Sequence, residues 1–269
     1  MLRKRVIFTL LFENDNFNLS RNFRLQKVGG LDWLKSNYNF ARISHSIDEL
    51  VVLDVSRTER NFNKFCDVVS AISTSCFIPI SAGGNVNSVA KAKTLLRNGA
   101  DKIVVNSALH EEGEMVNELA TVFGQQCIVG SVDVKKNDSG SHEILIRNGT
   151  YTLQNSALEV LSRVSELPIG ELYLNSIDQD GTGQGLDLNI LSLLPEDLQI
   201  PIILAGGVGN SRHLLEGLND DRVDAVATAN LFNFVGDGLE KAREELIKNG
   251  VPLPRWDLQY FQQIREANK

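Results

Sequence analysis

Ile-Pro-Ile-Ser-Ala-Gly-Gly occupies residues 78–84 of this chain, and Ile-Pro-Ile-Ile-Leu-Ala-Gly-Gly occupies residues 200–207. In both copies an aspartate follows the alanine of Ala-Gly-Gly by 19 residues, Asp101 in the first and Asp224 in the second (101 − 82 and 224 − 205). A strand, a glycine turn, a helix and a second strand are therefore repeated after 123 residues (205 − 82). A repeat of almost half the chain favours a doubled half-barrel over a solenoid, whose repeats are about 20–50 residues long.

The rest of the chain supports this interpretation, because short apolar runs typical of strands alternate with segments typical of helices. The expected strands are residues 5–11, 49–55, 77–81, 102–105, 127–132, 171–176, 200–204 and 224–228. The expected helices include residues 86–97, 112–123, 155–165, 211–218 and 237–249. This alternation predicts parallel strands covered by helices on their outer face. We predict a (β/α)₈ TIM barrel with two-fold half-barrel pseudo-symmetry, and an open doubly wound sheet is the alternative.

Length and composition agree with one such domain spanning residues 1–269. About 250 residues is typical of a (β/α)₈ barrel, and this chain has 269. A net charge of −7 and a pI near 5.2 argue against nucleic acid or an acidic membrane surface as the main partner. The N-terminal apolar run is too short for a signal peptide, and no run reaches the roughly 18 apolar residues of a membrane span. We expect a cytoplasmic protein.

Two segments lie outside the barrel pattern. Residues 134–154 contain two turn signals and two short β-rich runs, which predicts a β-hairpin inserted after the fifth barrel strand. This insertion would lie on the C-terminal side of the barrel, where active sites of this fold are found. Residues 251–269 begin with two prolines and follow the last expected helix, so they are expected to form a C-terminal tail.

The repeated glycine turns predict two anion sites. Glycine lets the backbone approach a ligand, and a following helix N-terminus is suited to phosphate. In a barrel the ends of neighbouring strands lie beside each turn, so each half supplies one site at the mouth. The predicted phosphate-binding residues are Gly83, Gly84, Asn106, Ser107, Gly206, Gly207, Ala229 and Asn230. The alternative is that the glycines only form tight turns.

The cysteines and histidines suggest neither a metal nor a cofactor. Cys66, Cys76 and Cys127 lie far apart and without metal-ligand spacing, as expected of isolated buried thiols. The four histidines are scattered along the chain. We therefore predict no metal and no cofactor.

Several runs resemble the cyclase subunit family of imidazole glycerol phosphate synthase. They are residues 1–7, 47–54, 99–102, 176–182 and 205–207, and the resemblance extends over nearly the whole chain. It implies a (β/α)₈ barrel that takes ammonia from a separate glutaminase subunit, a class I glutamine amidotransferase. The family uses this ammonia on a bis-phosphorylated substrate to make imidazole glycerol phosphate. Asp180 and Gly181, which lie in one of these runs, join the predicted phosphate-binding residues.

The internal symmetry relates one candidate acidic residue to a position that has no acidic side chain. A shift of 122 residues relates Glu49 to Glu171 (171 − 49), and the same shift relates Leu11 to Asp133 (133 − 11). In the family, both of the latter positions carry aspartates that act as acid and base of the cyclisation. Leucine can neither donate nor accept a proton, so Asp133 is the remaining candidate catalytic residue.

Two further departures fall at the same mouth. Leu19 stands where the family has a lysine, although Arg21 lies nearby as a candidate phosphate contact, and Asn85 replaces a third glycine of the first turn. These changes predict that the chain makes little imidazole glycerol phosphate.

The opposite end of the barrel keeps the family pattern. Arg5, Glu49, Lys102 and Glu171 begin strands, and their counterparts in the family form a salt-bridged gate through which ammonia enters. Charges at this depth are costly unless they are paired, and a solvated rim is the alternative. Asp101 matches a family residue at the face that docks the glutaminase.

Retained ammonia entry with an altered mouth resembles one branch of the family, the glycosyl amidation-associated proteins of surface-polysaccharide biosynthesis. There the barrel is accompanied by a glutaminase and an ATP-dependent sugar amidotransferase, and an acetamidino sugar is formed. This subunit role is our first hypothesis. The second is a genuine cyclase in histidine biosynthesis, with Asp133 alone or aided by Asp15, Asp178 or Asp180. The third is a catalytically silent barrel that scaffolds or activates the glutaminase.

Overall fold

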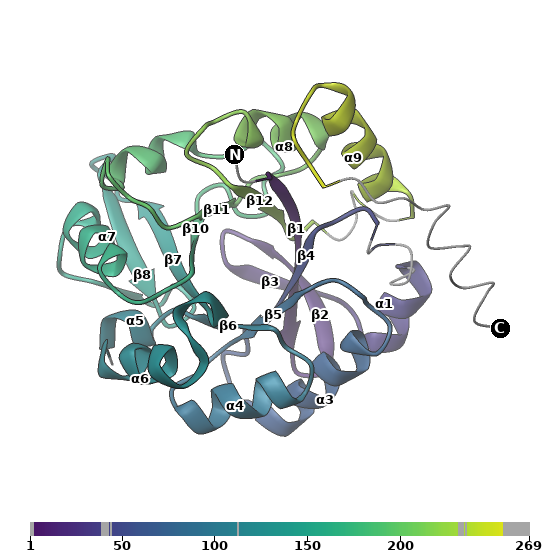
Figure 1. Cartoon of the computed structure of the whole chain (residues 1–269), viewed down its shortest axis with the longest axis horizontal. Coiled ribbons are helices and arrows are strands. Elements are labelled where there is room, and N and C mark those ends of the chain that lie inside the picture. Colours follow the sequence, from purple (N-terminus) through teal and green to yellow (C-terminus); the bar gives the residue numbers. More distant parts are fainter. Residues whose placement is uncertain are drawn as a thin grey trace.

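The computed structural model describes residues 3–38, 43, 45–111, 113–230, 234 and 236–254. Within these residues, eight parallel strands surround a central axis (Figure 1). They are β1 (Arg5–Glu13), β4 (Glu49–Asp54), β5 (Ile80–Gly83), β6 (Lys102–Val105), β7 (Ile128–Lys136), β10 (Glu171–Ser176), β11 (Ile202–Ala205) and β12 (Ala225–Thr228). Because β10 pairs with β7 and β12 pairs with β1, the sheet closes on itself. The predicted (β/α)₈ barrel is confirmed, and the open sheet is excluded.

Helices cover the outside of the barrel. They are α1 (Leu31–Asn37), α3 (Phe62–Ser73), α4 (Val89–Arg97), α5 (Ala108–Glu111), α6 (Gly113–Phe123), α7 (Ala157–Ser165), α8 (Ser211–Leu218) and α9 (Gly238–Lys248). Among the described residues, the connections also contain two 3₁₀ turns, η1 (Gln125–Cys127) and η2 (Leu188–Leu193). Several helices begin at an Asn or Ser whose side chain accepts a backbone N–H of the first turn. At α7 this cap is reciprocal, because Glu159 also bonds back to Ser156.

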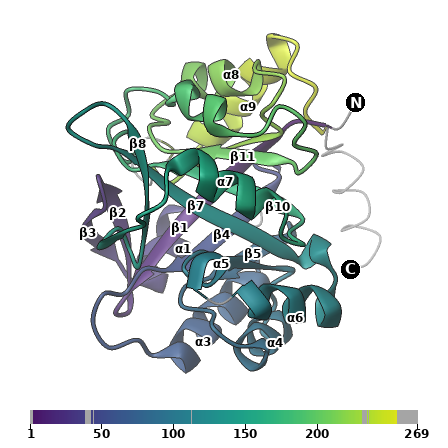
Figure 2. The ribbon, with the colours of Figure 1, turned by 90° about the vertical axis from the view of Figure 1, so that its left-hand side faces the viewer.

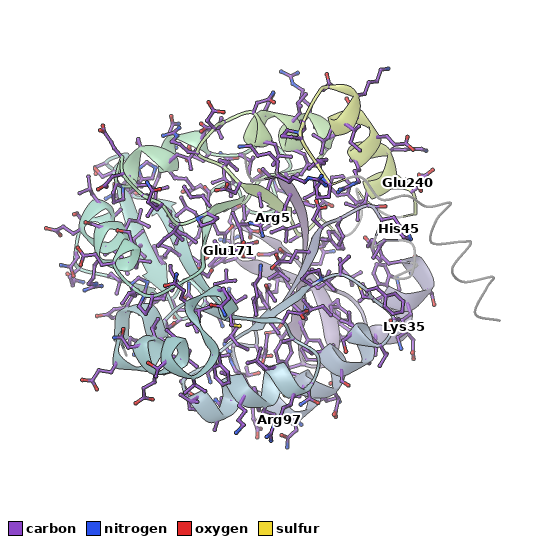
Figure 3. The ribbon with its side chains drawn as sticks, viewed as in Figure 1. Arg5, Lys35, His45, Arg97, Glu171 and Glu240 are labelled. Carbon is purple, nitrogen blue, oxygen red and sulfur yellow. The ribbon has the colours of Figure 1, made fainter. Side chains whose placement is uncertain are left out.

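The barrel separates two apolar layers. Outward-facing strand residues such as Phe8, Leu50 and Leu172 pack under the helices in the main core. Alternate residues of the same strands face the axis and form a smaller interior cluster. Figure 3 shows the corresponding contrast among charged residues, because Arg5 and Glu171 point into the ring of strands while Lys35 and Arg97 lie on the outer helices.

Two antiparallel extensions stand at the end of the barrel opposite the start of β1 (Figure 2). After β7, β8 (His142–Ile146) and β9 (Tyr151–Thr152) occupy the segment in which the hairpin was predicted. After β1, β2 (Asn16–Arg21) and β3 (Arg24–Gly29) form an extension that the sequence analysis did not identify. Of the predicted C-terminal tail, residues 255–269 lie outside the described residues.

Among the residues that the structure describes, no helix is long and apolar enough to cross a membrane.

Candidate functional site

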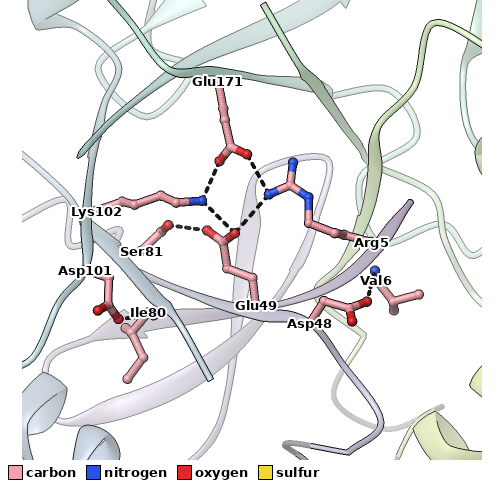
Figure 4. Close-up of polar contacts among 9 residues, drawn as sticks. All are labelled: Arg5, Val6, Asp48, Glu49, Ile80, Ser81, Asp101, Lys102 and Glu171. Atoms are coloured by element: carbon pink, nitrogen blue, oxygen red, sulfur yellow. Dashed lines mark hydrogen bonds and ion pairs between the residues drawn. The ribbon is translucent and has the colours of Figure 1, made fainter. Parts of the chain in front are cut away.

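Four charged side chains form a closed ring inside the barrel at the end where the strands begin (Figure 4). Nη1 of Arg5 lies 3.2 Å from Oε2 of Glu49 and 2.5 Å from Oε1 of Glu171. Nζ of Lys102 lies 2.9 Å from Oε2 of Glu49 and 2.7 Å from Oε2 of Glu171. Each cation therefore bridges both carboxylates, and the four formal charges sum to zero.

Ion pairing offsets the free energy lost when these four charges leave water, because an unpaired charge inside the barrel would carry a large desolvation cost. The Glu49 side chain is only 2% exposed and also accepts a hydrogen bond from Ser81. Burial lowers the pKa of the Lys102 ammonium, but the carboxylates of Glu49 and Glu171 outweigh this effect, so the pKa is raised. Lys102 therefore stays charged at neutral pH, and the ring stays closed by ion pairs.

The interior beyond the ring is largely apolar. One cluster of buried residues there consists of Ile7, Val51, Val104, Val129, Tyr173, Ile203, Ala205, Ala225 and Ala227. Its members alternate along the strands with the residues of the outer core, so they face the axis. A low-dielectric interior, which disfavours charged species, thus lies between the ring and the other end of the barrel.

A cavity of about 850 Å³ opens at the end where the strands finish. Its volume lies within the range of about 300–1,000 Å³ typical of small-molecule sites. The predicted site residues that line it are Gly84, Asn106, Ser107, Asp133, Asp180, Gly181, Gly206, Gly207, Ala229 and Asn230. Gly83 and the four ring residues do not line it. The structure therefore groups nearly all predicted phosphate and catalytic positions at one end, and the ring at the other.

Asp133 lies at this cavity near the end of the parallel part of β7 and is 9% exposed. Its Oδ2 accepts a hydrogen bond of 3.0 Å from Nδ2 of Asn106, and its Oδ1 accepts one of 3.0 Å from Nδ2 of Asn175. Burial raises the pKa of this carboxyl to about 6, the two amides lower it, and the nearby Asp180 raises it. A carboxyl poised so close to neutral pH is suited to taking up and returning a proton.

Leu11 lines the same cavity at the end of β1 and is 8% exposed. Its neighbour across the strand pair is Leu53 of β4, which also lines the cavity. The first half of the barrel therefore presents an apolar surface where the second half presents Asp133.

The glycine turns have a packing requirement of their own. A Cβ on Gly84 would lie 2.3 Å from the carbonyl oxygen of Asp54, and one on Gly206 would lie 2.5 Å from that of Ser176. Asn85 adopts a φ of 54°, in the left-handed region where asparagine substitutes for glycine most readily. The first turn therefore survives the loss of its third glycine, and tight turns remain a sufficient reason for the glycines without any phosphate.

The side chain of Asp180 is used to hold the β2–β3 hairpin. Its Oδ2 accepts hydrogen bonds of 2.5 Å from Oγ of Ser20 and 3.0 Å from the backbone N–H of Phe23. Gly181 is packed so closely that a Cβ would overlap the carbonyl oxygen of Ser20. The Asp180 side chain therefore anchors this hairpin, and phosphate binding at Asp180 and Gly181 stays a prediction.

Asp101 also has a structural partner. Its backbone N–H donates to the carbonyl oxygen of Ile80, and its Oδ2 accepts the N–H of the same residue at 2.8 Å. Asp224 forms the same pair of bonds with Ile202 in the second half of the barrel. This pair of hydrogen bonds explains why both copies of the repeat carry the aspartate. Docking of a glutaminase at Asp101 stays a prediction.

The cavity rim is rich in arginine, which the sequence analysis had noted only at Arg21. The lining arginines are Arg21, Arg24, Arg57, Arg60 and Arg147. Three are engaged, since Arg57 donates to the carbonyl oxygen of Phe23, Arg60 to that of Asp54, and Arg147 pairs with Glu111. A positive rim on a protein of net charge −7 is consistent with an anionic ligand.

Asn175 and Tyr173 were also not recognised from the sequence as site residues. Both lie on β10 in phase with Glu171, at two-residue intervals, so strand alternation could have placed them on the axis. Within the described part of the chain, no group of three or more His, Cys, Asp or Glu side chains could hold a metal ion.

Comparison with known proteins agrees with this architecture. A family model described as "Histidine biosynthesis protein" matches residues 35–236. A protein of Parasynechococcus marenigrum (strain WH8102) named "Putative imidazole glycerol phosphate synthase subunit hisF2" is 45% identical over 259 residues, which cover 96% of each chain. The surface-polysaccharide branch stays a prediction, whereas the resemblance to the synthase family is confirmed. The chain belongs to the histidine biosynthesis protein family of (β/α)₈ barrels.

Proposed function

We propose that this chain is the ammonia-accepting synthase subunit of a glutamine-dependent amidotransferase, of the imidazole glycerol phosphate synthase type. The observation that carries the proposal is the arrangement of one barrel interior, with a neutral ring of charges at its entrance and the Asp133 cavity at its exit. In this proposal a separate glutaminase docks at the ring end and releases ammonia there. The membership in the synthase family supports the same assignment.

The chemistry at each end follows from the groups present. Ammonia is small and uncharged, so a transient opening of the ring admits it, while ammonium is opposed by the apolar interior. In the cavity the nitrogen lone pair attacks an electrophilic carbon of the acceptor. The ionised Asp133 carboxylate takes the proton that the nitrogen must lose, and the protonated carboxyl returns it to a leaving oxygen. The arginine rim and the two glycine turns bind the acceptor's phosphates.

The name of the relative supports cyclisation to imidazole glycerol phosphate as the reaction, with Asp133 as its one carboxylate on the strand ends related by the half-barrel symmetry. Leu11 favours a second candidate, in which ammonia is passed to another acceptor such as the sugar of an amidation system. In that case a third, ATP-using protein would activate the acceptor. The two candidates share ammonia entry and differ in what occupies the cavity.

The test supplies the purified protein with ammonium salt and the bis-phosphorylated substrate of the family, and measures imidazole glycerol phosphate. We expect slow turnover by the native protein and faster turnover by Leu11→Asp, which restores the second carboxylate. Ordinary turnover by the native protein would establish the cyclase and remove the need for a second acid. No turnover by either protein would reject cyclisation and favour the sugar acceptor or a silent scaffold. Ammonia-dependent amidation of a sugar in a mixture with the third protein would then separate these two.

A further inference from the structure

One hydrogen bond crosses the barrel interior between the ring and Asp133. Oγ1 of Thr9 on β1 lies 3.1 Å from Oη of Tyr173 on β10. The pairing order places β11 and β12 between these two strands on one side and four further strands on the other. Side chains of such distant strands meet only through the interior, so the bond spans the space through which a small molecule would pass.

The position of this bridge along the axis is fixed by strand alternation. On β10, Glu171 belongs to the ring, Tyr173 to the bridge, and Asn175 holds Asp133. On β1, Arg5 belongs to the ring and Thr9 to the bridge. Two residues of a strand advance about 7 Å, so along β10 the backbone of Tyr173 lies roughly that far from those of Glu171 and Asn175. On β1, Thr9 lies two such steps beyond Arg5. Thr9 and Tyr173 both line the cavity, and they therefore form part of its floor.

The bridge is polar, buried and neutral. Thr9 is 2% exposed and Tyr173 is 6% exposed. Burial raises the pKa of the Tyr173 hydroxyl, the bond to Thr9 lowers it, and Asp133 and Asp180 raise it further. The phenol therefore stays protonated at neutral pH. Two hydroxyls sharing one hydrogen bond keep lone pairs that can accept further N–H groups.

We propose that the Thr9–Tyr173 hydroxyl pair is a binding station for ammonia at the floor of the cavity, where ammonia is held and oriented before it reacts. This inference rests on the proposed function. The hydroxyl oxygens accept N–H bonds from ammonia and leave its lone pair directed away from them, toward the acceptor in the cavity. The two hydroxyls are neutral and buried, so they supply ammonium with no counter-charge of their own. Thr9 and Tyr173 thus act as positioning residues beneath Asp133, which exchanges the proton.

Binding is tested directly by nuclear magnetic resonance on protein labelled at the tyrosine ring carbon that bears the hydroxyl. The chain contains four tyrosines, and the spectrum of Tyr173→Phe identifies the resonance of Tyr173. Ammonium chloride is titrated at an alkaline pH, where much of it is ammonia, and at an acidic pH, where it is ammonium. Potassium chloride is titrated as the salt control. We expect a saturable shift of the Tyr173 resonance at alkaline pH only, weakened in Thr9→Val.

The resonance of Tyr38 serves as an internal control, because this tyrosine is buried outside the barrel against Phe8 and Trp33. A Tyr173 resonance that does not move, or that moves equally with potassium chloride or at acidic pH, would overturn the inference. This outcome does not depend on turnover, so it is distinguishable from failure of the proposed function.

The kinetic test measures KM for ammonia and KM for the acceptor separately. Tyr173→Phe and Thr9→Val should each raise KM for ammonia about 3- to 10-fold, the range corresponding to one lost hydrogen bond, and leave KM for the acceptor unchanged. Thr9→Ser should restore the native value, and Tyr38→Phe should not change it. Equal increases of both KM values, or no rescue by serine, would show that the pair only supports the structure. A native protein without ammonia-dependent turnover would contradict the proposed function, and the titration would still decide the binding station.

Discussion

Each half of the barrel begins with a nine-residue strand, β1 in the first half and β7 in the second, and each strand continues into an antiparallel extension. Asp101 and Asp224 form equivalent hydrogen bonds with Ile80 and Ile202 in the two halves. At the mouth the halves differ, because Leu11 occupies the position that the half-barrel shift relates to Asp133. The repeated frame uses the same aspartate contacts in both halves, whereas the proposed proton transfer depends on one carboxyl in the second half. A symmetric fold therefore carries an asymmetric mouth.

The largest expected effect is the loss of the acid in the second half. Asp133→Asn should lower ammonia-dependent turnover by about 10²–10⁴-fold, since a positioned acid–base group contributes that much. The matched change in the first half, Leu11→Asn, adds an amide that exchanges no proton and should alter turnover only a few-fold. Similar losses in both variants, measured under saturating ammonia, would contradict the asymmetry.

The ring should respond to the loss of one member because its four charges are mutually paired. Lys102→Met leaves Arg5 between two carboxylates and should lower the free energy of unfolding by about 3 kcal/mol, the lower part of the range for a buried ion pair, since Lys102 is 20% exposed. It should also raise the ratio of glutamate released to ammonia incorporated. Lys241→Met removes the exposed pair with Asp237 and is the control, with no measurable change in the unfolding midpoint. If the two variants changed stability and the glutamate-to-ammonia ratio equally, the ring would consist of solvent-exposed ion pairs of little energetic weight.

The pH dependence of stability tests the environment of Asp133. Its folded pKa of about 6 lies above the value of 3.8 for an exposed aspartate, so the folded state binds the proton more tightly. Stability therefore falls as pH rises from about 4 to 6, and the penalty persists above that. Asp133→Asn cannot ionise, so its stability relative to the native protein should improve by about 3 kcal/mol between pH 4 and pH 7. A difference that does not change with pH would mean that the carboxyl is solvated.

The two extensions provide the smallest expected effect. Asp180→Asn removes the carboxylate that accepts from Ser20 and Phe23, and should reduce amide-exchange protection at Phe23 by about 1.5 kcal/mol, the lower end of the range for a hydrogen bond to a charged group. Asp178→Asn acts on the second extension, because Asp178 accepts the N–H of Lys136. Each variant should loosen its own extension. Loss of protection in both extensions from either change would show that they open together.

Much of the fold was predictable because its signals are local. The strands at residues 102–105 and 171–176 were predicted with the bounds that the structure gives. The β2–β3 extension was missed because its turns use pairs of non-glycine residues at positive φ, Asn14–Asp15 and Asn22–Phe23, in place of the usual glycine signal. Its anchor, Asp180, lies about 160 residues away in the chain.

The site was predictable only where polar residues follow or begin strands. The ring and the mouth residues lie at strand ends, and the repeat and the family resemblance identified them. The Thr9–Tyr173 bridge had no such signal, because a buried threonine and tyrosine on an apolar strand read as core residues. Their pairing depends on the order in which β1 and β10 close the barrel, which only the three-dimensional structure specifies.

The central claim is that ammonia travels from the ring to the Asp133 cavity inside one barrel. The measurement that tests it most directly uses the complex with its glutaminase, glutamine labelled with ¹⁵N in the amide, and a large excess of unlabelled ammonium in the medium. Product formed from the bis-phosphorylated substrate is then analysed by mass. Internal transfer predicts product that retains most of the ¹⁵N, and Lys102→Met should reduce this fraction. Product carrying the label only in proportion to the bulk ammonia pool would contradict the account.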